Sequence, residues 1–180
     1  GQPCDWSGAT FDDEVRFDEV VFDGRTDLTD ARFADDLEVV ECVFDDDLLF
    51  TEATIGGETT FRGVEFHGGA NVKVEDANFN EARFHGPTRF DSVEFRSASF
   101  DQAGFDDTLR FTDSEFELDA SFQDARFPTY TDLEAVEIHG SIEIIPDVDH
   151  DVLIDLEHSY LQQGRLSQPE GASAYYDCTR

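Results

Sequence analysis

The chain has 180 residues, of which 43 are Asp or Glu and 12 are Lys or Arg, so its formal net charge is −31. Such an acidic surface repels nucleic acid phosphates and anionic lipids, so we expect no direct nucleic acid binding. No apolar run approaches the ~20 residues needed to span a bilayer. The 18 Phe residues indicate a folded core, because highly charged disordered chains are poor in aromatic residues.

Large apolar residues recur along the chain in steps that alternate between five and six residues. They are Trp6, Phe11, Phe17, Phe22, Leu28, Phe33, Val39, Phe44, Phe50, Ile55, Phe61 and Phe66, and then Phe79, Phe84, Phe90, Phe95, Phe100, Phe105, Phe111, Phe116, Phe122, Phe127, Leu133, Ile138 and Ile144. A helix needs apolar residues three and four apart, and an alternating strand needs them two apart, so neither element explains the series.

A small or β-branched residue stands two positions before most members of this series. Examples are Cys4, Ala9, Ala31, Cys42, Ala53, Val64, Ala77, Ala82, Ala98, Ala103, Ala120 and Ala125. Residues two apart in an extended segment point to the same side, so each unit directs one small and one large side chain inward. Pairs such as Asp12-Asp13 and Gly56-Gly57 follow and suit corners. The pattern predicts an all-β solenoid.

The units resemble those of the pentapeptide-repeat family, whose unit is A-(D/N)-(L/F)-x-x. The best matches are Ala77-Asn78-Phe79-Asn80-Glu81, Ala82-Arg83-Phe84-His85-Gly86 and Ala98-Ser99-Phe100-Asp101-Gln102. The resemblance implies a right-handed quadrilateral β-helix with four units per coil over residues 4–145. The alternation of five with six departs from the family pattern and gives coils of 22 residues.

Stacking coils of this length predicts four inward ladders. They are Phe11, Phe33, Ile55, Val74, Phe95, Phe116, Ile138; Phe17, Val39, Phe61, Phe79, Phe100, Phe122, Ile144; Phe22, Phe44, Phe66, Phe84, Phe105, Phe127; and Leu28, Phe50, Val72, Phe90, Phe111, Leu133. Neighbouring coils should lie about 4.8 Å apart, which lets phenylalanine rings stack.

The series is interrupted between His67 and Asn78, a stretch that contains Gly68, Gly69 and Lys73. Phe66 and Val74 are eight residues apart where the repeat would place eleven. We interpret the interruption as a deleted corner, with a functional loop or notch as the alternative.

Residues 146–180 keep weaker traces of the same pairing, interrupted by Pro146 and Pro169. We expect degenerate coils or a cap there. The chain has no Met and begins at Gly1, and repeat-like material lies near both ends. We therefore expect a fragment of a larger, cytoplasmic protein.

The three cysteines are predicted to be free thiols. Cys4 and Cys42 occupy inward small-residue positions, and Cys178 lies near the far end of the rod. The two ends of six coils should be about 30 Å apart, much further than the ~7 Å that a disulfide between Cys4 and Cys178 allows.

One possible metal site follows from the third ladder. The residues after its phenylalanines form an outer column of Asp23, Asp45, His67, His85, Asp106 and Pro128. His67 and His85 would then be neighbours about 5 Å apart beside carboxylates, a set that a divalent metal can use. The alternative is two exposed histidines at equivalent corners.

The other charged residues are interpreted structurally. The paired carboxylates fit no calcium-binding loop spacing and suit solvated corners. Arg16, Arg32, Arg83, Arg89, Arg110 and Arg126 precede inward residues, where they can pair with acids on neighbouring coils.

We therefore expect a non-enzymatic scaffold or protein-interaction domain with an unknown protein partner and no cofactor, because no catalytic or phosphate-binding motif is present. With 26 Asp and the single lysine Lys73, the composition resembles that of proteins from salt-loving organisms.

Some pentapeptide-repeat proteins that protect DNA gyrase resemble B-DNA in size and charge, which makes DNA mimicry an alternative. Residues 1–145 carry 36 acidic and 10 basic residues, a net −26, where B-DNA would carry about 18 charges over about 30 Å. We expect the acid to be spread over all four sides.

Overall fold

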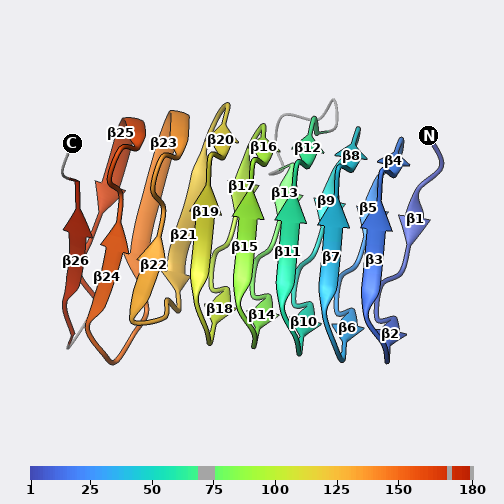
Figure 1. Cartoon of the computed structure of the whole chain (residues 1–180), viewed down its shortest axis with the longest axis horizontal. Coiled ribbons are helices and arrows are strands. Elements are labelled where there is room, and N and C mark those ends of the chain that lie inside the picture. The colour runs from blue at the N-terminus through green and yellow to red at the C-terminus, as the bar shows by residue number, and fades with distance from the viewer. Residues whose placement is uncertain (69–75, 170–171, 179–180) are drawn as a thin grey trace.

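The protein is a straight rod of stacked β-strand coils (Figure 1). The computed structural model describes residues 1–68, 76–169 and 172–178. The described part of the chain contains strands and no helix, and the strand pairs in it are parallel. The N-terminus lies at one end of the rod and the C-terminus at the other.

Each coil contributes one short strand to each of four faces, which we number in chain order. Face 1 contains β1 (Cys4–Asp5), β5 (Thr26–Asp27), β9 (Leu48–Leu49), β13 (Ala77–Asn78), β17 (Ala98–Ser99) and β21 (Ala120–Ala125). Face 2 contains β2 (Thr10–Phe11), β6 (Arg32–Phe33), β10 (Thr54–Ile55), β14 (Arg83–Phe84) and β18 (Gly104–Phe105).

The other two faces complete each coil. Face 3 contains β3 (Val15–Asp18), β7 (Leu37–Val40), β11 (Thr59–Arg62), β15 (Thr88–Asp91), β19 (Leu109–Thr112), β22 (Tyr130–Asp132), β24 (Val152–Asp155) and β26 (Ala174–Asp177). Face 4 contains β4 (Val21–Phe22), β8 (Val43–Phe44), β12 (Glu65–Phe66), β16 (Glu94–Phe95) and β20 (Glu115–Phe116).

Two longer strands pass around the corner from face 4 to face 1. β23 (Glu137–Pro146) pairs with β20 through its first residues and with β21 through its last, and β25 (Tyr160–Leu166) pairs with β23. The eight strands of face 3 show that the parallel stacking continues through β24 and β26, inside residues 146–180. The solenoid predicted from the repeat is therefore confirmed.

The five-residue steps correspond to tight corners with a left-handed residue. At the corner after Leu28, Asp30 has φ 59° and the Ala31 amide donates to the Leu28 carbonyl at 3.0 Å. Equivalent positive φ values recur between faces 1 and 2 and between faces 3 and 4, at Gly8, Glu19, Glu41, Glu52, Gly63, Glu81, Ser92, Gln102, Asp113, Asp124, Ala135 and His158. Polar side chains at these corners point to solvent, which is why the acidic residues do not disturb the core.

The core is a continuous aromatic stack. Phe11 and Phe17, in the first coil, are partly exposed, and the other 16 phenylalanines are buried. Rings one coil apart stack nearly parallel, as in Phe79–Phe100 and Phe100–Phe122, each with centroids 4.8 Å apart. The small residues predicted to face inward are also buried from Ala31 onward, with Ala53, Ala82 and Ala103 fully so, whereas Cys4 and Ala9 in the first coil are partly buried.

The predicted ladders hold up to Phe66 and are wrong after it. Ile55 pairs with Phe84 and then Phe105, not with Val74 and Phe95. Phe61 pairs with Phe90, which pairs with Phe111, instead of leading to Phe79 and Phe100. Phe66 pairs with Phe95, which pairs with Phe116, instead of leading to Phe84 and Phe105. The last ladder continues through Phe79 and Phe100, because Leu49 pairs with Asn78 and then Ser99. Each later ladder residue therefore lies two faces away from its predicted position, on the opposite side of the rod.

The cause is an insertion, not the predicted deletion. Ile55 and Phe84 are paired although they are 29 residues apart, whereas Phe11 and Phe33 are 22 apart and Phe84 and Phe105 are 21 apart. Val72, Lys73 and Val74 lie outside the described residues.

The three cysteines are free, with Cys42 buried, Cys4 partly buried and Cys178 exposed. Burial raises the pKa of the Cys42 thiol above its usual range. Among the described residues, no helix has the length and apolar character to cross a membrane.

Candidate interaction face

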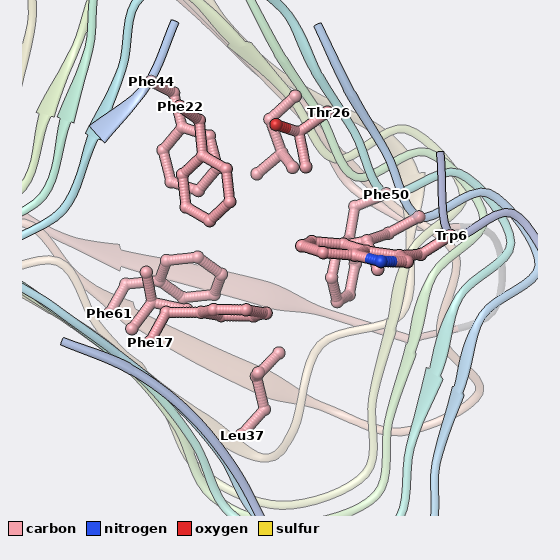
Figure 2. A pocket seen from close by; sticks show the side chains of 11 residues that line it. Trp6, Phe17, Phe22, Thr26, Leu37, Phe44, Phe50 and Phe61 are labelled. Atoms are coloured by element: carbon pink, nitrogen blue, oxygen red, sulfur yellow. The ribbon is translucent and has the colours of Figure 1, made fainter. Parts of the chain in front are cut away.

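The described part of the rod encloses very little space. A small apolar cavity of about 10 Å³ lies in the first coils, where Trp6, Phe17 and Phe61 contribute to its lining (Figure 2). This is about the room of one water molecule. Any recognition by the described residues therefore takes place on the outer faces.

The midline of face 4 carries four glutamates in successive coils, which we call the glutamate ladder: Glu65, Glu94, Glu115 and Glu137. They are directly paired in register from β12 through β16 and β20 to β23. The same column begins with Val21 and Val43 and ends with Tyr160. These strands follow one another along the upper edge of the rod in Figure 1.

The ladder is open to solvent. The side chains of Glu65, Glu115 and Glu137 are 47%, 49% and 62% exposed. Glu94 is also exposed and makes no ion pair within the described ranges. Like charges directly opposite on neighbouring strands destabilise a sheet, so this column does not stabilise the fold.

Two histidines border the ladder. His67 Nδ1 lies 3.0 Å from Asp45 Oδ1, and its Nε2 lies 3.1 Å from Glu65 Oε2. His139 Nε2 lies 3.1 Å from Glu115 Oε1 and 3.6 Å from Glu137 Oε2. The hydrogen bond with Asp45 raises the pKa of His67 above its usual value, against the opposing effect of burial.

Arg96 lines a hollow with Glu94 beside the ladder, whereas the arginines of faces 2 and 3 lie away from it. On face 3, Arg16 pairs with Glu38 of the next coil, and Arg110 pairs with Asp132 at 2.7 Å. Arg89, on the same face, pairs with Glu58. These three pairs confirm the predicted pairing across coils, although Arg83 instead donates to the Gln102 carbonyl. The face 3 midline carries both arginine and acidic residues, whereas the charged residues of the described face 4 midline are all glutamates.

The predicted neighbourhood of His67 and His85 is also wrong. His67 follows Phe66 on face 4, whereas His85 follows Phe84 on face 2, because the insertion shifts the later coils by two faces. His85 Nδ1 instead lies 2.6 Å from Asp106 Oδ2. Within residues 1–68, 76–169 and 172–178, no group of three or more His, Cys, Asp or Glu has the arrangement of a metal site.

The glutamate ladder corresponds to a repeated pattern in the sequence. Each glutamate directly precedes the inward residue, in Val64-Glu65-Phe66, Val93-Glu94-Phe95, Ser114-Glu115-Phe116 and Val136-Glu137-Ile138. The shifted ladders separated Glu65 from the other three, so the column could not be recognised.

The stacked parallel coils with an aromatic interior define a β-solenoid of short repeats. The family model described as pentapeptide repeats (9 copies) matches residues 7–54 and 71–115, which together exceed half of the chain. The protein belongs to the pentapeptide-repeat family.

No curated protein matches the chain significantly. Among solved structures, a trypsin-treated variant of QnrB1, a plasmid-mediated fluoroquinolone resistance protein, aligns with 15% identity and a TM-score of 0.45. The alignment covers 90% of this chain and 91% of that chain.

Proposed function

We propose that the protein is a non-enzymatic scaffold that binds a basic protein surface through face 4. The glutamate ladder carries this proposal: four exposed carboxylates in register along one side of a rigid rod, without arginine partners on the same midline. A row of Arg or Lys side chains is the partner chemistry that complements it.

Two faces built by the same repeat differ in the charges that they bring together. The face 3 midline contains attractive pairs such as Arg16–Glu38 and Arg110–Asp132, although Arg89 also lies opposite Arg110. On face 4, the three strand pairs from β12 to β23 each bring two glutamates together, and each loses a fraction of a kcal/mol. A cationic partner removes this repulsion when it binds, which makes the face a stronger binding surface than its area alone suggests.

Two features support a scaffold over an enzyme. Catalytic sites are usually concave pockets, and the described interior is filled by phenylalanine, with a cavity of only about 10 Å³. The exposed Val21 and Tyr160 at the two ends of the glutamate column add apolar contact area that a protein partner can cover.

The test is binding of a fluorescein-labelled octa-arginine peptide, measured by fluorescence anisotropy at low salt and pH 8. The double variant Glu94→Gln/Glu115→Gln should bind about tenfold more weakly, because it removes two charges from the middle of the ladder. The matched control is Glu52→Gln/Glu81→Gln, two exposed corner glutamates away from face 4. Equal affinities for the two double variants would show that only net charge matters and would refute the assignment to face 4.

A second candidate function is DNA mimicry directed at a DNA-binding protein such as gyrase. The observation that favours it is the continuous row of carboxylates, spaced at about the 4.8 Å of neighbouring strands, on a straight rod. If it is correct, the protein should alter supercoiling by gyrase, and Glu94→Gln/Glu115→Gln should weaken the effect more than Glu52→Gln/Glu81→Gln does. An inactive wild-type protein would refute this candidate.

We also propose that the remaining acidity is an adaptation to concentrated salt. The excess of Asp and the single lysine support this proposal. Molar KCl should raise the melting temperature by screening the repulsion among the carboxylates. A melting temperature that falls or stays constant would refute it.

A further inference from the structure

Three of the four ladder glutamates contact a histidine. His67 reaches Glu65 at one end of the ladder, and His139 lies between Glu115 and Glu137 at the other. Both imidazoles are about half exposed, at 53% and 43%, so they exchange protons freely with solvent. A charge on either ring therefore appears directly beside the proposed binding surface.

The surroundings of His67 are mainly acidic. Asp45 and Glu65 contact its two ring nitrogens, and Glu94, Arg96 and Glu117 line the same surface hollow. Arg96 is a cation of this hollow, and it pairs with the buried carboxylate of Asp76 at 3.3 Å.

His139 has a similar environment in the later coils. Glu115 and Glu137 are its ion-pair partners, and Glu117 occupies the equivalent position one coil earlier. The ring of Tyr160 lies 5.8 Å away. His158 lines a hollow together with Glu115, Glu137 and Tyr160, and its own nearest ion-pair partner is Glu134 at 3.4 Å.

We propose that protonation of His67 and His139 controls binding at face 4. The ladder carboxylates are available to a cationic partner when the imidazoles are neutral, and they are paired with the imidazoles when these are charged. This inference rests on the proposed function of face 4. In the neutral state each ring only donates or accepts a hydrogen bond. In the charged state each ring becomes a cation held by ladder carboxylates, and an incoming arginine must compete with it.

The direction of the pH effect follows from the contacts. An imidazole titrates between about pH 5 and 8, a range in which ordinary carboxylates stay ionised. Because the pKa of His67 is raised, its charged form is present at higher pH than in an unfolded chain. The His67 contacts with Asp45 and Glu65 therefore stabilise the fold below the unfolded-state pKa of about 6.5, and this contribution disappears as the pH rises through the folded-state value. Partner binding changes in the opposite direction and strengthens as the pH rises.

The experiment measures binding of the octa-arginine peptide from pH 5.5 to pH 8.5 at constant ionic strength. The peptide is used here without its fluorescein label, which itself titrates in this range, and binding is measured by calorimetry. Its guanidinium groups stay protonated throughout. The wild-type protein should bind about fivefold more weakly at pH 6 than at pH 8, the size expected for two new exposed charges. The variant His67→Asn/His139→Asn should bind with the same affinity at both values.

The matched control is His85→Asn/His150→Asn, which removes two exposed histidines that pair with Asp106 and Asp149 away from the ladder. It should keep the wild-type pH dependence. Thermal melts of each variant at pH 6 and pH 8 verify that the fold is intact, and His67→Gln/His139→Gln provides a second neutral pair.

The outcomes separate the two proposals. If the peptide binds through the ladder but the wild-type protein and His67→Asn/His139→Asn share one pH profile, the proton control is refuted and the binding face stands. If the wild-type protein does not bind at pH 8, or if Glu94→Gln/Glu115→Gln binds as well as the wild type, both proposals are refuted.

Discussion

In residues 77–127 every large inward position is phenylalanine, whereas in residues 4–66 Leu28, Val39 and Ile55 interrupt the aromatic series. In the later coils Phe90 and Phe111 stack at 4.5 Å and Phe95 and Phe116 at 4.6 Å. In the earlier coils Val39 lies between Phe17 and Phe61, and the cavity of about 10 Å³ is found there.

This difference shows how one repeat can build coils of unequal stability. In a solenoid each coil contacts only its neighbours, so the total stability is close to a sum of coil and interface terms. A continuous column of stacked rings makes the contact between neighbouring coils strongly stabilising. A smaller residue in that column weakens the contacts with the coils on both sides. We expect the first coils to open before those that contain Phe79 to Phe122.

The largest expected effect is the loss of a ring from the filled region. Phe100 is fully buried and stacks on Phe79 and Phe122. Phe100→Ala should therefore destabilise the protein by about 3–5 kcal/mol. Phe17→Ala, in the first coil, should lose only about 1–2 kcal/mol, because that ring is partly exposed. Chemical denaturation of the two variants measures the difference, and equal losses would contradict the unequal cores.

A smaller effect is expected at the junction between the two regions. Gly68 has φ +70°, and an added Cβ would lie 1.8 Å from Asp76 Oδ1. Gly68→Ala should lose about 2–3 kcal/mol, because the left-handed conformation and the carboxylate both oppose it. Gly63→Ala is the control: it has φ +59°, but its nearest atom is Glu41 Cγ at 3.6 Å, so only about 1 kcal/mol is expected. Similar losses for both would show that Asp76 can move aside.

The smallest expected effect is a gain. Val39→Ile adds one methylene at the cavity in the first coils and should stabilise the protein by about 0.8 kcal/mol or less. Val93→Ile adds the same group in the filled region, where Val93 is fully buried, and should destabilise by about 1 kcal/mol or more. A shift of the melting temperature in the same direction for both would mean that the two cores are packed alike.

The local structure could be predicted because it depends on neighbouring residues. The phenylalanine series gave the inward positions, and the Ala, Cys and Val residues two positions earlier proved to be buried as expected. Arginine positions such as Arg16 and Arg110 indicated ion pairs across coils, which the structure contains. Each of these inferences uses only the alternation of sides along an extended chain.

The site could not be predicted because it depends on contacts between coils. Glu65 can be placed beside Glu94 only if the number of residues in the longer coil between them is known. An insertion changes that number without changing the repeat pattern on either side. The same uncertainty placed His67 beside His85 and separated Glu65 from Glu94, whereas Glu94, Glu115 and Glu137 were already neighbours in the predicted first ladder.

The sequence by itself determined a repeat of one small and one large inward side chain, acidic corners outside an aromatic core, and therefore a solenoid, to which the family resemblance added the expectation of four sides. The tertiary structure alone decided which coil residues meet. Strand pairing fixes that register through backbone hydrogen bonds on either side of the insertion: the Leu48 amide donates to the Asp76 carbonyl, and the Phe50 amide donates to the Asn78 carbonyl. The physical reason is that side-chain periodicity specifies the direction of each residue, whereas the phase between coils is set by the length of chain that joins them.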